Sequence, residues 1–288
     1  MKNLIVFSII GFLAQLIDGS LGMAYGLTST TLLLLWGISP AIASASVHLS
    51  EIATTAVSGA AHLKFKNVDK KLAIQLIIPG SVGAFLGATF LSNLPGDLIR
   101  PYISLFLLIL GIYVTIRFLF MKEFKEEKSE IRISTKHSIP LGFTAGFLDA
   151  TGGGGWGPVI TPILLSKKGV SARKVIGTVD TSEFAIAVSA SLGFLISIGV
   201  DNINWRLVLA FMIGGVIAAP IAAWLVKIVP AQLMGVIIGG FIIVINARTL
   251  LITFLNNESL YSIILNTIVI LWILAILLAL YKFNKKSI

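Results

Sequence analysis

Hydrophobic residues occupy most of this chain in long runs that are separated by short polar breaks. The runs predict α-helical segments at residues 3–18, 22–37, 40–63, 72–92, 98–120, 138–150, 154–166, 170–199, 204–227, 231–254 and 259–281. A run of about 20 apolar residues is what an α-helix needs to cross the hydrocarbon core of a bilayer. The pattern therefore predicts an all-α polytopic membrane protein.

Four of these segments are too short to span a bilayer comfortably. They form two pairs, 3–18 with 22–37 and 138–150 with 154–166, and glycines interrupt each pair. Non-helical backbone at membrane depth is tolerated only inside protein or along a water-filled cavity. We therefore expect each pair to lie within the bundle, either as broken spanning segments or as a re-entrant hairpin.

Composition supports this class and excludes several others. Hydrophobic residues make up 56% of the chain and charged residues 12%, about half the charged share of an ordinary soluble domain. The absence of cysteine excludes a disulfide framework, a thiolate metal site and a cysteine nucleophile. We expect no metal and no cofactor. We also expect no nucleic-acid partner, because the basic residues behind the net charge of +9 gather in a few loops, as in the cytoplasmic loops of membrane proteins.

The first half of the chain recurs in the second half. A shift of 131 positions places Asp18 on Asp149 and Tyr25 on Trp156. Six further pairs are identical at this shift: Gly11 and Gly142, Phe12 and Phe143, Ala14 and Ala145, Gly22 and Gly153, Gly26 and Gly157, and Thr30 and Thr161. The sequence thus predicts two repeats of five segments, 1–121 and 138–254, joined by a cytoplasmic linker at 122–137. An extra C-terminal transmembrane helix with a basic tail follows at 255–288.

The second repeat is expected to enter the membrane in the opposite sense, because five is an odd number of segments. The loops support this inversion. Residues 64–71 are basic where the equivalent loop at 199–206 has one arginine, and residues 167–174 are basic where the equivalent loop at 37–40 has no charge. With basic loops in the cytoplasm, the N-terminus lies outside and the C-terminus inside.

Inverted repeats with glycine-interrupted segments at matching positions are typical of secondary transporters, whose substrate lies near the midplane of the bilayer. The free N–H groups and the positive dipole end of a helix that begins after such a break favour an anion. The alternative is that the glycines only allow close helix packing. The predicted substrate site consists of Gly22, Tyr25, Gly26, Ser50, Gly152, Gly153, Gly154, Gly155, Trp156 and Ser182.

Ionisable residues inside apolar segments cost roughly 2.5–3.5 kcal/mol each, so each needs a partner or a purpose. The candidates for proton coupling are His48, Glu51, Asp180, Glu183, Asp18 and Asp149. His48 and Glu51 share one helix face, as do Asp180 and Glu183. If the pseudo-two-fold axis brings these two faces together, His48 approaches acidic partners, and a histidine–carboxylate pair titrates near neutral pH.

Two structural interpretations of these residues stay open. The first is a hydrogen-bond network that holds the repeats together. The second is that Asp18 and Asp149 cap the helices that follow them. Since acidic side chains repel an anion, we expect them to be protonated, paired or set behind the glycine loops.

The chain resembles the TauE/SafE family of sulfite and organosulfonate exporters over roughly residues 5–252. The residues that carry the resemblance are Gly142, Phe143, Ala145, the glycine cluster at 152–157, Pro158, Pro162, Gly177 and Thr178, and in the first repeat Gly11, Gly19, Gly22, Gly26, Pro79, Gly80 and Gly83. The resemblance implies a prokaryotic plasma-membrane transporter of sulfur-containing or other small organic anions. Residues 47–51 and 180–183, at the start of the long helices, include acidic side chains. They depart from the neutral pattern that is commoner in the family at this place.

We therefore expect a secondary transporter of small anions that works by alternating access and is coupled to protons. A passive anion channel is one alternative, and it would not accumulate substrate against a gradient. An intramembrane enzyme with Asp18 and Asp149 as an acid–base dyad is the other. The sequence disfavours the enzyme, because it has neither a histidine-rich metal site nor a GxGD string.

Overall fold

The computed structural model describes residues 2–21, 23–120, 134–165, 172–225, 231–255 and 257–286. Within these residues the chain is helical and contains no strand. The helices are α1 Lys2–Leu21, α2 Tyr25–Leu35, α3 Pro40–Lys64, α4 Lys70–Ser92, α5 Gly96–Leu119, α6 Thr135–Gly152, α7 Trp156–Leu165, α8 Ala172–Ile198, α9 Trp205–Leu225, α10 Ala231–Phe254 and α11 Glu258–Lys286, with a 3₁₀ turn at Val200–Asn202. The predicted all-α class is confirmed.

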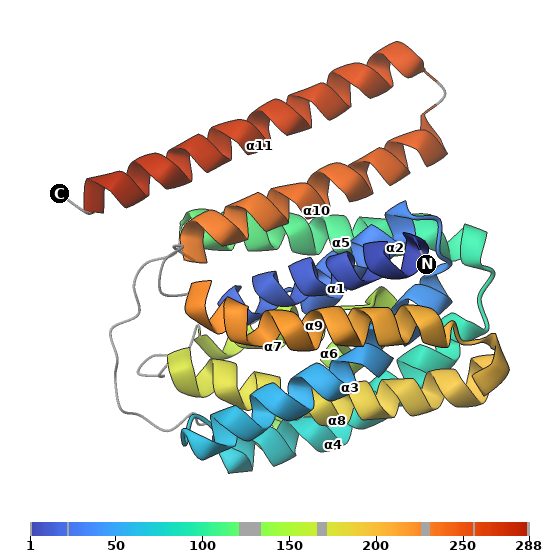
Figure 1. Cartoon of the computed structure of the whole chain (residues 1–288), viewed down its shortest axis with the longest axis vertical. Helices are drawn as coiled ribbons and strands as arrows, with labels where there is room; N and C mark the ends of the chain where they lie inside the picture. The colour runs from blue at the N-terminus through green and yellow to red at the C-terminus, as the bar shows by residue number, and fades with distance from the viewer. Residues whose placement is uncertain are drawn as a thin grey trace.

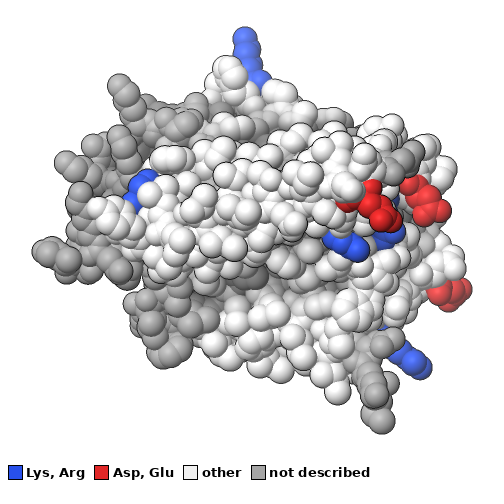
Figure 2. Space-filling model, turned by 90° about the horizontal axis from the view of Figure 1, so that it is seen from above, with Lys and Arg blue, Asp and Glu red and all other residues white. Residues whose placement is uncertain are grey.

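Five described helices are long and apolar enough to cross a membrane: Lys70–Ser92, Gly96–Leu119, Lys174–Ile198, Gln232–Phe254 and Glu258–Lys282. α3 is also long, at 25 residues, but serines, His48 and Glu51 make it more polar. Figure 2 shows a face whose broad middle carries almost no charged side chain, with the acidic side chains towards one end. An apolar surface of this kind is what a bilayer requires of the face that it covers.

The helices lie side by side along roughly one direction (Figure 1). α4 and α8 form one edge of the bundle and α11 forms the other, with the short helices α2, α6 and α7 between them. α4 packs on α6 and α8, α1 packs on α9, α5 packs on α10, and α3 packs on α8. The two broken regions are therefore enclosed by longer helices.

Glycines set the closest helix contacts. A Cβ atom added to Gly11 of α1 would lie 2.6 Å from the Phe211 carbonyl oxygen of α9, and one added to Gly142 of α6 would lie 2.9 Å from the Leu76 carbonyl oxygen of α4. Small residues at such positions let helix backbones approach each other in a membrane. The α1–α9 and α4–α6 contacts thus use glycines that are 131 positions apart in the sequence.

α11 is attached to the bundle mainly through its C-terminal half. The Trp272 ring lies against Gly240, and its indole N–H donates to the Val236 carbonyl at 3.1 Å. Lys282 donates to the Leu119 carbonyl at 3.1 Å and lies 4.6 Å above the Phe120 ring. Most of the remaining surface of α11 is exposed and apolar, so this helix borders the bundle rather than the broken regions.

Candidate functional site

The break between α1 and α2 is organised by Asp18. Its Oδ1 atom accepts hydrogen bonds from the backbone N–H groups of Ala24 at 2.8 Å and Tyr25 at 3.1 Å. Tyr25 is the first residue of α2, and the first N–H groups of a helix have no partner within the helix. Asp18 therefore caps α2 from the end of the preceding helix.

The break between α6 and α7 repeats this arrangement. Asp149 Oδ1 accepts from the backbone N–H groups of Gly155 at 2.6 Å and Trp156 at 3.0 Å. Gly153 and Gly154 make the turn at φ values of +69° and +151°, which a side chain would disfavour. Each acceptor and each donor in the first break has its counterpart 131 positions later in the second break. Both aspartates therefore have the capping geometry.

These caps change which N–H groups an anion can reach. The N–H groups of Tyr25, Gly155 and Trp156, which the sequence placed in the anion site, already face carboxylates. The first turns of α2 and α7 also contain Gly26, Leu27 and Gly157, whose N–H groups receive no cap from either aspartate. These three groups are the helix-start donors left for a ligand.

The two breaks cross in direct backbone contact. A Cβ atom added to Gly26 would lie 2.5 Å from the Gly154 Cα atom and 2.7 Å from the Gly153 carbonyl oxygen. Thr30 of α2 donates to that carbonyl oxygen at 2.6 Å. Glycine is thus required on both sides of the crossing, because any larger residue would separate the two chains.

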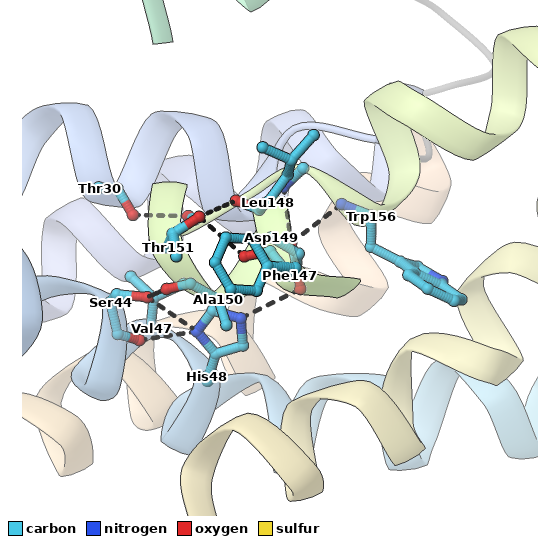
Figure 3. A network of polar contacts seen from close by, with 12 residues as sticks. Thr30, Ser44, Val47, His48, Phe147, Leu148, Asp149, Ala150, Thr151 and Trp156 are labelled. Carbon is cyan, nitrogen blue, oxygen red and sulfur yellow. Dashed lines mark hydrogen bonds and ion pairs between the residues drawn. The ribbon is translucent and has the colours of Figure 1, made fainter. Parts of the chain in front are cut away.

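His48 of α3 joins the second break to the bundle (Figure 3). Its Nε2 atom lies 3.1 Å from Asp149 Oδ2, and its Nδ1 atom lies 2.8 Å from the Ser44 carbonyl oxygen. Both ring nitrogens face oxygen acceptors, which a doubly protonated imidazole satisfies in full. Ser44 also donates to the Ala150 carbonyl at 2.6 Å. The sequence expected acidic partners for His48 on the Asp180–Glu183 face, whereas the partner in the structure is Asp149.

The aromatic residues that open α2 and α7 are each tied to a serine. The Tyr25 hydroxyl lies 2.9 Å from Ser50 Oγ, and the Trp156 indole N–H donates to Ser182 Oγ at 3.1 Å. Each serine also donates to a carbonyl of its own helix, at 2.7 Å in both cases. Trp156 is fully buried, and its indole points away from the His48 network in Figure 3. The serines therefore fix the short helices on α3 and α8.

A small cavity lies where the two breaks cross. Its volume is about 10 Å³, the room of about one water molecule. The residues that line it are Asp18, Met23, Ala24, Tyr25, Gly26, Leu27, Gly154, Gly155, Pro158 and Glu183.

Part of the predicted substrate site lines this cavity, namely Tyr25, Gly26, Gly154 and Gly155. Ser50, Gly152, Gly153, Trp156 and Ser182 do not line it, and Gly22 lies outside the described residues. Sequence analysis missed Met23, Ala24, Leu27 and Pro158. These residues could have been found from their position directly beside the glycines, because the residues next to a break in the sequence line a cavity at that break.

The remaining acidic candidates occupy different surroundings. The Glu51 side chain is buried, with 3% exposure, and makes no hydrogen bond with any described residue. Glu183 faces the cavity, and Asp180 Oδ2 lies 3.9 Å from His62 Nε2 near the start of α8. In the part of the chain that the structure describes, no group of three histidine or acidic side chains could hold a metal ion.

Comparisons with known proteins agree with this architecture. Residues 7–249 match the family model described as "Sulfite exporter TauE/SafE". The chain is 63% identical over 288 residues to the "Probable membrane transporter protein YtnM" of Bacillus subtilis (strain 168), and the match covers the whole chain and 96% of that protein. No solved structure matches. The resemblance noted from the glycine motifs is confirmed, and the chain belongs to the TauE/SafE family of membrane transporters.

Proposed function

We propose that this protein is a secondary transporter of small anions of the sulfite or organosulfonate type and that its substrate binds where the two breaks cross. The observation that carries the proposal is the crossing itself. Gly26 and Gly154 meet in backbone contact, and a cavity opens beside them. Uncapped N–H groups at the start of a helix suit an anionic group, so Gly26, Leu27 and Gly157 are the proposed donors.

Alternating access follows from two inverted repeats, residues 1–121 and 138–254. Three features support this division of the chain. The aspartate caps, the aromatic–serine contacts and the close glycine contacts each occur twice, at positions 131 or 132 apart. The proposed topology places the N-terminus outside the plasma membrane and the C-terminus in the cytoplasm.

The cavity is much smaller than an organosulfonate, so substrate binding requires the starts of α2 and α7 to move apart. Few side chains oppose such a movement at the crossing, because glycine lies on both sides of it. The Thr30 hydrogen bond to Gly153 holds the crossing together from one side. Rocking of one repeat against the other would open the crossing to one face of the membrane at a time.

Proton coupling is assigned to the buried ionisable residues around the crossing. His48 and Asp149 form a fixed pair, whereas the Glu51 side chain is buried and the Glu183 side chain lines the cavity, and neither carboxylate makes a hydrogen bond with a described residue. Unpaired carboxylates at membrane depth are costly when charged. Glu51 and Glu183 are therefore the proposed sites that gain and lose the coupled proton, with Asp18 and Asp180 as further acidic neighbours.

The test is flux into proteoliposomes that contain the purified protein. Sulfite, thiosulfate, sulfoacetate, acetate and sulfate are offered with and without a pH gradient. Saturable uptake of a sulfur anion that a pH gradient drives uphill is expected, and Glu183→Gln should abolish the dependence of flux on the gradient. Flux that only follows the substrate gradient would identify a passive channel, and no flux of any anion would remove the proposal.

A further inference from the structure

Two pairs of residues face each other where α3 packs on α8. His62 faces Asp180 near the start of α8. We name these residues the inner pair, because α3 continues from His62 into the basic residues 64–71, which the proposed topology places in the cytoplasm. His48 packs against Phe194 near the other end of α8, and these residues are the outer pair. The interval of 132 positions separates His48 from Asp180 and also His62 from Phe194, so an axis that exchanges the proposed repeats exchanges the two pairs.

The outer pair is closed in this structure. The centroids of the His48 and Phe194 rings are 6.1 Å apart, and both residues are 0% exposed. The two ring nitrogens of His48 already face acceptors on Asp149 and Ser44. No path from solvent to the crossing therefore passes between these two side chains.

The inner pair faces across a gap. His62 Nε2 and Asp180 Oδ2 are 3.9 Å apart, too far for a hydrogen bond, and the two side chains are 26% and 14% exposed. The Asn67 amide nitrogen lies 3.4 Å from His62 Nδ1 and donates to it, which leaves the imidazole proton on Nε2. Asp180 Oδ2 makes no hydrogen bond with any described residue. A donor on α3 thus faces an acceptor on α8, and a shift of about 1 Å would join them.

A polar face of α3 leads from the crossing to the inner pair. Its residues recur every three or four positions, which places them on one side of the helix: Glu51, Thr55, Ser58 and His62. This side faces α8, because the Ser58 side chain interacts with Asp180. Exposure rises along it from 3% at Glu51 to 6% at Thr55 and 26% at the His62 side chain. The face is therefore most accessible at its His62 end.

We infer that the inner pair is the cytoplasmic gate of the transport route, and that in this structure the outer pair is closed while the hydrogen bond of the inner pair is not formed. The inference rests on the proposed function, because a gate needs a route to control. When the gate closes, His62 Nε2–H donates to Asp180 Oδ2 and the two helices approach at this end. Opening of the other face then requires Phe194 to leave His48, so the two pairs alternate as inverted repeats require. His62 and Asp180 act as positioning residues that control access to the crossing.

Cysteine labelling tests the gate without depending on a substrate. The chain contains no cysteine, so Thr55→Cys introduces a single thiol between the crossing and the gate. A membrane-impermeant methanethiosulfonate is added to inside-out and right-side-out vesicles, and it should react from the cytoplasmic face. Adding His62→Ala should raise that rate about tenfold, because the closed state loses one hydrogen bond to a charged group.

Val57→Cys is the matched control. Val57 is 60% exposed and lies on the opposite side of α3, so His62→Ala should leave the labelling of its thiol unchanged. Ser58→Cys, which lies nearer to the gate, repeats the measurement if Thr55→Cys does not fold.

A charge exchange separates a gate from a merely structural contact. His62→Asp places two carboxylates together and should raise the labelling of Thr55→Cys as His62→Ala does. Adding Asp180→His restores the pair in reverse order and should return the rate to that of Thr55→Cys alone.

The outcomes separate the gate from the proposed function. Labelling that His62→Ala leaves unchanged, equal labelling from both faces, or failure of the exchange to restore the rate would each overturn the inference. Sulfite flux in the same vesicles is measured separately. Gated labelling without flux would overturn sulfite as the substrate and leave the gate in place.

Discussion

Asp18 and Asp149 offer a natural comparison within one chain. Each carboxylate caps a short helix through two backbone N–H groups. Asp149 accepts one more hydrogen bond, from His48 at 3.1 Å. Replacing each aspartate by alanine therefore removes the same cap from both breaks but removes a contact with a charged partner from the second break alone.

The expected free energies differ accordingly. Loss of a helix cap costs about 0.5–2 kcal/mol, and loss of a hydrogen bond to a charged group costs about 1.5–3 kcal/mol. Asp18→Ala should lower the free energy of unfolding by about 0.5–2 kcal/mol and Asp149→Ala by about 2–5 kcal/mol. The upper end is expected for Asp149, because its side chain is 2% exposed whereas Asp18 is partly exposed.

The assay is denaturant unfolding in detergent micelles, followed by circular dichroism, for both single variants, His48→Ala and the double variants. His48 and Asp149 should show a coupling energy of about 1.5–3 kcal/mol in a double-mutant cycle. His48 and Asp18 should be additive within about 0.5 kcal/mol. Equal costs for the two aspartates, or equal coupling of His48 to both, would refute the assignment of His48 to the second break.

Four further substitutions test other parts of the structure. Gly26→Ala should lower the free energy of unfolding by about 1–3 kcal/mol through overlap with Gly154, whereas Gly37→Ala should cost only the strain of its φ of +85°, about 1–2 kcal/mol, because nothing lies within 4 Å of its added Cβ atom. Flux measurements check the functional side, since Gly26→Ala should also abolish transport and Gly37→Ala should not. Trp156→Phe removes the indole donor to Ser182 and should reduce flux in a protein that still elutes as a single folded species; unchanged flux would exclude a role in transport. Trp272→Ala should lower the melting temperature in detergent by a few degrees and leave flux intact, and a loss of flux would show that α11 takes part in transport.

The helical segments were predictable because hydrophobicity in a membrane protein is a local property. The eleven predicted segments correspond in order to the eleven described helices, and the break after Asp149 falls within the run of glycines. The polar character of α3 was also visible in the sequence. Helix ends shifted by a few residues, as at α6, which begins at Thr135 rather than at 138.

The role of the two aspartates was harder to predict. Capping and ligand binding both place a carboxylate beside a helix start, so residue type alone does not distinguish them. The distinction depends on whether the chain folds back far enough for Oδ1 to reach N–H groups six and seven residues later. That spacing occurs in both breaks, and the repeated interval between an aspartate and an aromatic residue was the usable signal.

The partner of His48 could not be predicted from helical periodicity. Periodicity places His48 and Glu51 on one face of α3, and the expected partners were the acids at matching positions on α8. α3 contacts both α6 and α8, and Asp149 lies 101 positions from His48 at the end of α6. The choice between these neighbours depends on how deeply α6 inserts before its glycines end it, which is a property of tertiary packing.

The two breaks therefore share a backbone design but differ in chemistry. Both have an aspartate cap and an aromatic residue tied to a serine. The residue 132 positions after His48 is Asp180, which faces His62 instead of a break. The second break is thus fixed to α3 through His48 while the first has no matching contact from Asp180. Because His48 bonds to one break alone, the Glu51 and Glu183 carboxylates make no hydrogen bond with the other described residues, and the proposed proton coupling is assigned to them for this reason.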